Sequence, residues 1–239
     1  MITKNSPVPI YLQIAQVIRG QIINEEYKVN DKIPTEEELV KRYGVSRMTA
    51  RNAVSQLVNE GLVYRVHGVG AFVSREKLKR NLNRLTGFYE DMKELGYKPS
   101  SKVLLKERRR PNQREQIALG LTKEQEVFYI SRIRMVDDDP VGLQSMVVPV
   151  YRVPDLDQIN LSDTSFYTYL EEKNLAIEKA EQRMEAVNAP NICKEIGLED
   201  TTPLFFFERV SYTEEQEPIE LLDSYFRGDF YSYYITLYR

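Results

Sequence analysis

A short turn between two amphipathic segments is the feature that most constrains how this chain can fold. The first segment begins at Thr35, which forms a capping-box pattern with Glu38, and acidic residues fill its first turn. The second begins at Ser46 and stops at Gly61, where glycine adopts a left-handed helix cap at little cost. Only residues 43–45, the glycine-containing tripeptide YGV, separate the two. This spacing predicts a helix-turn-helix.

A further helical pattern precedes this pair, and a hairpin pattern follows it. Apolar residues recur at helical spacing over residues 9–24. After the second helix of the pair, the β-prone runs LVYRV and AFV flank the glycine-rich turn HGVG, which is typical of a β-hairpin. Three helices and a hairpin in this order predict a winged helix-turn-helix domain over residues 1–73.

The second helix of the pair has two chemically different faces. Residues such as Ala53 and Leu57 form its apolar face, whereas Arg47 and Asn52 lie on the other face. In the major groove, arginine pairs with guanine and asparagine with adenine. A threonine at a helix N-terminus can hold a phosphate, and glycines let a wing backbone approach the minor groove. The predicted DNA-binding residues are Thr35, Arg47, Thr49, Arg51, Asn52, Gly68 and Gly70. The alternative is a structural three-helix unit that binds no DNA.

The charge of the chain favours nucleic-acid binding only when its two parts are separated. The net charge is −3, but residues 1–75 hold 10 Lys+Arg and 7 Asp+Glu (+3), and the remainder holds 23 and 29 (−6). Because +3 is modest for one DNA-binding domain, we expect two copies to bind together. The expected complex is a homodimer on double-stranded, pseudo-palindromic operator DNA, with half-sites roughly one helical turn apart. The Tyr-rich residues 230–238 are one candidate surface for self-pairing.

The rest of the chain predicts a second domain of a different class. The basic stretch over residues 74–84 is the expected interdomain linker, and residues 85–239 have mixed periodicity. Predicted helices are 87–95, 112–119, 165–173 and 191–196, and predicted strands are 103–109, 127–136, 142–149, 177–186, 204–213 and 218–225. Long strands joined by hairpins predict an α+β domain with an antiparallel sheet and peripheral helices.

A candidate anion site lies on the predicted strand 127–136. Arg132 and Arg134 are two residues apart and therefore share one face of this strand. Two adjacent guanidinium groups repel each other unless an anion or an acid lies between them. The strand is otherwise apolar, which favours a pocket. The alternative is a solvent-exposed face with surface ion pairs.

Two further segments offer polar side chains to a ligand. Ser165 and Tyr167 place hydroxyls beside the free amides at the start of a predicted helix, with Ser162 or Asp163 as its expected N-cap, an arrangement that suits phosphate. On the last long strand, the carboxylate of Glu220 can accept hydrogen bonds from sugar hydroxyls or an amine. The alternative for this residue is an exposed strand charge.

Composition argues against several other classes of protein. With a single histidine, His67, and a single cysteine, Cys193, the chain offers no His/Cys metal site, no internal disulfide and no Ser/His/Asp or Cys/His catalytic set. We therefore expect no catalytic residues, no metal and no cofactor, with catalysis by carboxylates or tyrosine as the remaining enzyme alternative. Because no signal peptide or membrane-spanning apolar run is apparent, we expect a cytoplasmic protein.

The N-terminal segments resemble a known family. PIYLQIAQVIRGQI, IPTEEELVKRYGVSRMTARNAVSQLVNEGLVYR and GVGAFV, within residues 7–73, are similar to the DNA-binding domain of the GntR family. The resemblance implies DNA contacts for Arg47 and Arg51 and for a wing glycine, Gly68 or Gly70. Two positions depart from the family pattern: Glu37 and Val69 stand where many relatives have basic residues.

The second half resembles the UTRA ligand-binding domain of the HutC subfamily, which is related in fold to chorismate lyase. The segments are LTGFYEDMKELGYKPSSKVL, SRIRMVDDDPVGLQSMVVP, TSFYTYLEE and EPIELLDSYFRGDFYSY. The strongest resemblance is to the N-acetylglucosamine-utilisation repressors, which bind amino-sugar phosphates. It implies a phosphate site that contains Arg132, Arg134, Ser165, Tyr167 and the backbone near Phe88 and Tyr89, and it implies that Glu220 binds the sugar.

Two departures in this half concern the sugar end of the implied site. Gln144 stands where those repressors have a glutamate, and Phe226 where they have a tyrosine. Loss of a carboxylate and a hydroxyl weakens recognition of an amine or of one sugar hydroxyl. We therefore expect a repressor of carbohydrate-utilisation genes that is released by a sugar phosphate, without assigning the sugar. The alternatives are a non-phosphorylated effector, such as a carboxylic acid, and an activator.

Overall fold

The computed structural model describes residues 2–3, 6–66, 68–74 and 77–238, so His67 lies outside the described residues. The chain divides into two compact units, Met1–Lys77 and Leu78–Arg239. Within the described ranges, no helix is both long enough and apolar enough to cross a membrane.

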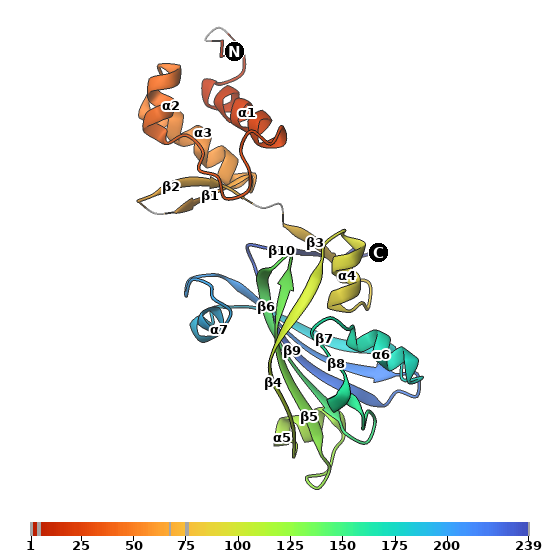
Figure 1. Cartoon of the computed structure of the whole chain (residues 1–239). Coiled ribbons are helices and arrows are strands. Elements are labelled where there is room, and N and C mark those ends of the chain that lie inside the picture. The colour runs from red at the N-terminus through yellow and green to blue at the C-terminus, as the bar shows by residue number, and fades with distance from the viewer. Residues whose placement is uncertain (1, 4–5, 67, 75–76, 239) are drawn as a thin grey trace. The chain divides into compact units, whose positions relative to one another are not determined.

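The first unit consists of three helices and a β-hairpin (Figure 1). Its elements are α1 (Ile10–Ile23), α2 (Glu36–Tyr43), α3 (Arg47–Asn59), β1 (Val63–Val66) and β2 (Gly70–Val73). Thr35 and Glu38 form the expected capping box, and Gly44 ends α2 with a φ of +60°. The winged helix-turn-helix predicted from the sequence is confirmed.

One buried cluster fixes α3 within this unit. Leu57 on α3 is fully buried and belongs to the same cluster as Ile14 on α1, Leu39 on α2 and Val63 on β1. Burial of each such side chain contributes about 1.5–3 kcal/mol. Because this cluster engages only one face of α3, the opposite face stays accessible.

The second unit is built on a six-stranded antiparallel sheet with the strand order β4-β5-β6-β9-β8-β7 (Figure 1). These strands are β4 (Pro99–Arg109), β5 (Val127–Val136), β6 (Asp139–Pro149), β7 (Ile177–Val187), β8 (Leu204–Thr213) and β9 (Pro218–Arg227). A separate pair of short strands, β3 (Leu78–Asn81) and β10 (Tyr231–Tyr234), runs parallel. The expected α+β fold is therefore confirmed.

Helices cover both faces of the large sheet. On the inner face, the face that carries Arg132, lie α4 (Phe88–Glu94) and α6 (Phe166–Glu172). On the opposite, outer face lie α5 (Gln113–Leu119) and α7 (Pro190–Glu195), over two smaller apolar clusters. The alternation of side chains along the long strands supplies both faces with apolar residues, which is why helices can pack on each.

Two segments differ from the sequence expectations. Residues 78–81 were expected within the linker 74–84 but form β3, the first element of the second unit. Residues 231–234 form β10, which pairs with β3 of the same chain, and Tyr231 is only 1% exposed. The end of this stretch, including Leu237 and Tyr238, is exposed, so its use in self-pairing stays a prediction. Local patterns missed this sheet because it joins two four-residue strands from opposite ends of the unit.

Candidate functional site

The first unit exposes the side chains predicted to read DNA. Arg47, Arg51 and Asn52 are exposed on α3, and the face of α3 that holds Ala50 and Ala53 is buried. This separation is what a recognition helix requires, because the polar face stays hydrated until DNA replaces the water.

The hydroxyls of the two threonines predicted to contact DNA already take part in helix capping: Thr35 caps α2, and Thr49 contacts the residue that caps α3. The Thr35 hydroxyl accepts a hydrogen bond from the Glu38 N–H at 3.3 Å and donates to a Glu38 carboxylate oxygen at 2.8 Å. The backbone and hydroxyl bonds from Thr35 lower the pKa of Glu38, which therefore carries its negative charge at the start of α2. The Thr49 hydroxyl lies 2.9 Å from that of Ser46, the N-cap of α3. A DNA phosphate near Thr35 must therefore compete with a carboxylate.

The wing is shaped by glycine and by an arginine that the sequence reading did not single out. Gly68 and Gly70 have φ values of +74° and +147°, and a side chain at Gly70 would clash with Lys32. Arg65 on β1 donates through Nη2 to Glu36 Oε1 (3.1 Å) and to a hydroxyl and a carbonyl oxygen of α3. These bonds attach the base of the wing to both helices of the helix-turn-helix.

The second unit contains a small cavity on the inner face of the sheet. All nine side chains predicted to bind an effector line it: Phe88, Tyr89, Arg132, Arg134, Gln144, Ser165, Tyr167, Glu220 and Phe226. They come from α4, β5, β6, β9 and the start of α6, so the fold brings together residues that are far apart in the sequence. The cavity volume is about 30 Å³, room for about two water molecules.

Arg132 is the most unusual side chain in this cavity. It is 1% exposed, and among the described residues neither its Nε nor its Nη1 atom has a hydrogen-bond partner. Its Nη2 atom donates to Gln144 Oε1 at 3.3 Å. Burial lowers the pKa of Arg132 to about 10. A buried cation with two unpartnered donors is costly unless an acceptor enters the cavity.

Arg134 is also buried but is better satisfied. Its Nε donates to Gln144 Oε1 at 2.9 Å and its Nη1 to the Ser101 hydroxyl at 2.8 Å, and its guanidinium lies 4.9 Å from the centre of the Phe88 ring. Burial, followed by the charge of Arg132, lowers the pKa of Arg134 well below its ordinary value. The alternative of a solvent-exposed face with surface ion pairs is therefore wrong for these two arginines.

One neutral oxygen lies between the two cations. Gln144 Oε1 accepts from both Arg132 and Arg134, while the amide Nε2 of Gln144 donates to the Ser224 hydroxyl at 3.0 Å. An amide oxygen carries only a partial negative charge, so the positive charge of the pair stays largely uncompensated there. An anion would be a stronger acceptor for both groups.

The cavity also contains a buried acid, Glu220. It is 1% exposed, so the alternative of an exposed strand charge is wrong, and it accepts hydrogen bonds from the hydroxyls of Ser211 (2.9 Å) and Tyr167 (3.3 Å). Burial raises the pKa of Glu220, although Arg209 and the hydrogen bonds oppose this shift. Burial and the nearby Glu220 raise the pKa of Tyr167 to about 12, so its hydroxyl stays protonated as a donor.

Ser165 has a different local role from the one expected. It is itself the N-cap of α6, where its hydroxyl accepts the Thr168 N–H at 3.3 Å, so the expectation that Ser162 or Asp163 caps this helix is wrong. Its side chain nevertheless lines the cavity.

The sequence analysis did not identify two arginines that line the cavity, Arg209 and Arg80. Arg209 on β8 donates to the Tyr167 hydroxyl (3.0 Å) and to Gln182 (2.8 Å), and strand alternation with Phe207 could have placed it on the inner face. Arg80 on β3 forms an ion pair with Asp91 at 2.5 Å and also lines the cavity. It was missed because its segment was assigned to the linker.

The cavity is suited to binding rather than to chemistry. Guanidinium groups converge on it, whereas among the described residues Glu220 is the single carboxylate that lines it. Within the described residues, no group of three histidine, cysteine or acidic side chains is placed to hold a metal ion.

The sequence and the fold both have clear relatives. Residues 10–73 match the bacterial regulatory proteins of the gntR family, and residues 94–232 match the UTRA domain. The chain is 34% identical to the HTH-type transcriptional repressor NagR of Bacillus subtilis (strain 168) over 97% of this chain and 96% of that protein. It is 28% identical to MngR, the mannosyl-D-glycerate transport/metabolism system repressor of Escherichia coli (strain K12), over 97% of each.

A solved structure supports the fold independently. The crystal structure of PhnF from Mycobacterium smegmatis aligns with a TM-score of 0.69, covering 94% of this chain and 98% of that chain at 23% identity. NagR and MngR are both named as repressors, and neither is named as an enzyme. This chain therefore belongs to the gntR family of bacterial regulatory proteins, and it is a DNA-binding transcription regulator with a UTRA domain.

Proposed function

We propose that this chain is a repressor of carbohydrate-utilisation genes that binds operator DNA as a homodimer and is released by a sugar phosphate. One observation carries the effector class: Arg132 is buried beside Arg134 with two guanidinium nitrogens unpartnered among the described residues. A phosphate supplies several strong acceptor oxygens to such a pair. The similarity to MngR and to a probable fructoselysine utilization operon repressor supports a sugar-containing effector.

The phosphate is proposed to replace Gln144 as the acceptor shared by the two arginines. Its oxygens would bond Arg132 and Arg134, with the hydroxyl of Ser165 and the backbone of Phe88 and Tyr89 around them. A carboxylate effector offers fewer acceptor oxygens to the same cations, which is why phosphate is favoured.

The sugar is proposed to lie toward Glu220. At one side the hydroxyl of Tyr167 can donate and the carboxylate of Glu220 can accept. The ring of Phe226 stacks on Phe88 at 6.2 Å to form an apolar wall. Because the free cavity of about 30 Å³ is smaller than a sugar phosphate, binding must displace side chains. Effector binding is thereby coupled to a change in the surrounding elements.

The coupling is proposed to run through β3. This strand follows the first unit directly, and its Arg80 both lines the cavity and pairs with Asp91 on α4, the helix that also carries Phe88 and Tyr89. An effector that moves α4 therefore acts on the strand that begins after Lys77. Shifting the dimer from mostly operator-competent to mostly released requires about 5.5 kcal/mol of differential affinity.

DNA recognition is assigned to the first unit. Arg47, Arg51 and Asn52 are proposed to contact bases, Thr35 and Thr49 the phosphate backbone, and Gly68 and Gly70 the minor groove. Two such heads on one pseudo-palindromic site multiply the discrimination of a single helix. A protein that acts on operator DNA in this way works in the bacterial cytoplasm.

The test is isothermal titration of the full-length protein with sugar phosphates, their dephosphorylated sugars and inorganic phosphate. We expect one or more sugar phosphates to bind, the parent sugar to bind at least about 30-fold more weakly, and inorganic phosphate to compete. Binding of the parent sugar or of a simple carboxylic acid with equal affinity would overturn the phosphate assignment. In vitro transcription from the operator separates repression from activation.

A further inference from the structure

The strand β7 is an unusually open edge of the large sheet. It spans eleven residues, Ile177–Val187, and β8 is its only neighbouring strand in the sheet formed by the described residues. Residues 181–186 are exposed on both faces of the strand. A long edge of this kind presents a row of backbone donors and acceptors to any matching strand.

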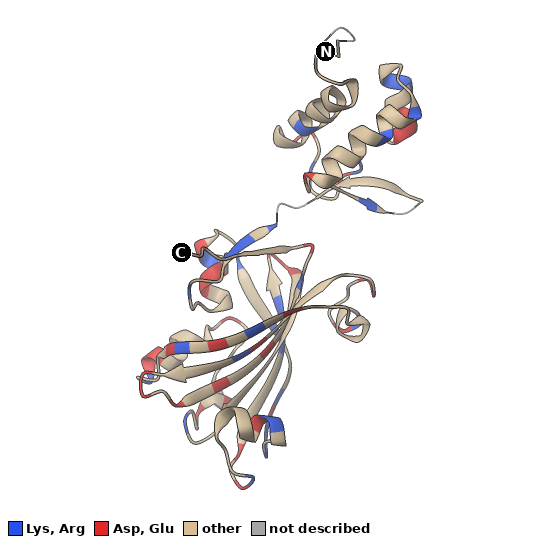
Figure 2. Ribbon diagram, turned by 180° about the vertical axis from the view of Figure 1, so that it is seen from behind, with Lys and Arg blue, Asp and Glu red and all other residues tan. Residues whose placement is uncertain are grey.

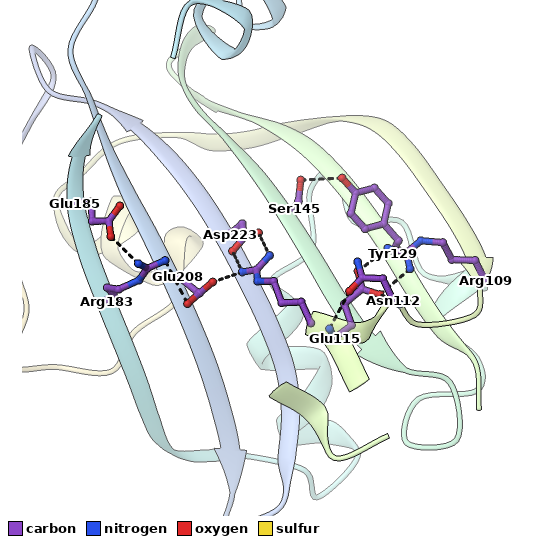
Figure 3. Close-up of polar contacts among 10 residues, drawn as sticks. Arg109, Asn112, Glu115, Tyr129, Ser145, Arg183, Glu185, Glu208 and Asp223 are labelled. Atoms are coloured by element: carbon purple, nitrogen blue, oxygen red, sulfur yellow. Dashed lines mark hydrogen bonds and ion pairs between the residues drawn. The ribbon is translucent and has the colours of Figure 1, made fainter. Parts of the chain in front are cut away.

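The charges on the outer face of β7 follow a self-complementary order. Lys179, Glu181, Arg183 and Glu185 alternate in sign along this face. Along their own strand, Lys179 pairs with Glu181 at 2.7 Å and Arg183 with Glu185 at 2.6 Å. Arg183 also lies 3.6 Å from Glu208 on β8 (Figure 3). These side chains are 45–62% exposed, so their present pairs add little stability and can exchange for others. Figure 2 shows the alternating basic and acidic bands that the strands of this unit carry.

We propose that β7 pairs antiparallel with β7 of a second copy of this chain, around a two-fold axis at Gln182. In this register Lys179 lies opposite Glu185 of the other copy, and Glu181 lies opposite Arg183. The two-fold axis repeats both pairs, so every charged residue from 179 to 185 faces an opposite charge, which stabilises a strand pair.

Neighbouring registers lack this match. Moving the axis to residue 181 places Glu181 opposite itself and Lys179 opposite Arg183. Moving it to residue 183 places Arg183 opposite itself and Glu181 opposite Glu185. Like charges directly opposite each other destabilise a strand pair, so the charge order selects one register.

The inner face of β7 connects this interface to the effector cavity. Gln182, at the proposed axis, lines the cavity and accepts a hydrogen bond from Arg209 at 2.8 Å. Met184 is 45% exposed on the same face and would lie opposite Ala180 of the other copy, which removes apolar surface from water. The second strand would therefore border the cavity, and an effector that moves Arg209 acts directly on the subunit contact. This inference rests on the homodimer of the proposed function and specifies its register.

Charge reversal tests the register. Either Glu181→Arg or Arg183→Glu gives residues 181 and 183 the same charge, and the two-fold axis places these residues opposite each other twice. We therefore expect the dimer dissociation constant, measured by sedimentation equilibrium, to rise at least about tenfold. The double variant Glu181→Arg/Arg183→Glu restores opposite charges and is expected within about threefold of wild type. Glu178→Arg, an equally exposed change on the same strand that would face Ala186, serves as the control and is expected to leave the constant unchanged.

Disulfide trapping tests the same register without changing charge. The cysteines of Gln182→Cys would lie directly opposite each other, within the 4.4–6.8 Å Cα separation that a disulfide needs. Those of Ala186→Cys would lie eight strand positions apart, about 27 Å. We therefore expect mild oxidation to link the first variant and not the second, since the native Cys193 is buried.

The outcomes separate this inference from the dimer itself. A dimeric wild type whose association resists both single reversals, or whose Ala186→Cys variant is linked as readily as Gln182→Cys, overturns the β7 register and leaves the dimer in place. A wild type that stays monomeric at micromolar concentration, free and on operator DNA, overturns both.

Discussion

The two units hold their functional arginines in opposite ways. In the first unit, Arg47 and Arg51 are exposed on a helix whose other face forms the core. In the second unit, Arg132 and Arg134 are 1% and 5% exposed beneath the sheet's covering helices. DNA is a large polyanion that meets a preformed surface, whereas a small anion must be surrounded and desolvated to be held selectively. The arginines proposed to bind DNA in the first unit therefore have little effect on its folding stability. The arginines proposed to bind the effector in the second unit lower the stability of the unliganded protein.

The largest expected effect is on operator binding. Arg51→Ala should weaken operator affinity at least about 30-fold, because a base contact contributes about 1–3 kcal/mol and a dimer loses two of them. Since Arg51 is exposed, the melting temperature should stay within about 1 °C of wild type. Fluorescence anisotropy at fixed salt measures the first quantity and a thermal melt the second.

A matched change at the far end of the same helix makes this test specific. Asn59→Ala is also exposed, but it lies at the C-terminal end of α3, and it should leave operator affinity nearly unchanged. Equal losses in the two variants would show that the N-terminal half of α3 is not the reading surface.

Removing a buried charge from the second unit should separate binding from stability. Arg132→Met keeps most of the side-chain volume but removes the donors, so effector affinity should fall at least about 30-fold. The melting temperature should rise, because burial disfavours the charged guanidinium in the unliganded protein. Calorimetry with the effector and a thermal melt without it give the two readouts.

The control for this variant is an arginine in the opposite environment. Arg110→Met removes an exposed guanidinium from the same unit and should alter neither effector affinity nor the melting temperature by much. If Arg132→Met instead lowers both affinity and melting temperature, the cavity arginine has a structural role and the contrast between the units fails.

Much of the contrast between the units could be predicted from local patterns. Alternation along a strand places Arg132 and Arg134 on one face, and helical periodicity separates the polar and apolar faces of α3. Each of these patterns is contained in a short stretch of consecutive residues. They predicted a fold that the comparisons confirm, and five of the nine side chains that line one cavity. The other four, Phe88, Tyr89, Gln144 and Phe226, were named only through the resemblance to a known family.

The parts that could not be predicted depend on contacts between distant segments. Arg80 reaches the cavity because β3 pairs in parallel with β10, opposite Tyr233, and four-residue strands carry too little pattern to reveal a partner so far along the chain. Arg65 acts through Glu36, which belongs to a different element. Which strand forms the edge of a sheet is likewise a property of the whole topology, so the open side of β7 is visible only in the fold.

A smaller effect is expected on the pH dependence of the free energy of unfolding, where the buried Glu220 should differ from an exposed acid. Burial raises the pKa of Glu220 above its ordinary value of 4.5, so between these two pKa values the folded protein binds more protons than the unfolded chain. Stability contributed by this group therefore falls as the pH rises through that window. Glu220→Gln should match wild type at low pH and exceed its free energy of unfolding by about 1 kcal/mol above the window.

Urea unfolding at several pH values measures this difference. Glu215→Gln, an exposed change in the turn between β8 and β9, should show no such dependence. A gap between wild type and Glu220→Gln that does not vary with pH would mean that the gain arises from packing and not from the desolvated carboxylate.

The smallest expected effect concerns a polar network in the first unit, the one around Arg65 at the base of the wing. Arg65 contacts Glu36, Ser55 and the Arg51 carbonyl through a single nitrogen, Nη2, and its side chain is 39% exposed. Arg65→Lys keeps the charge but loses the guanidinium geometry, so we expect a loss of only a few-fold in operator affinity. The loss should be the same for operators of different sequence, because the wing is repositioned while the base-reading side chains of α3 are unchanged. Anisotropy titrations against wild-type and single-base-variant operators measure this, and a change in sequence preference would show that Arg65 also orients Arg51 itself.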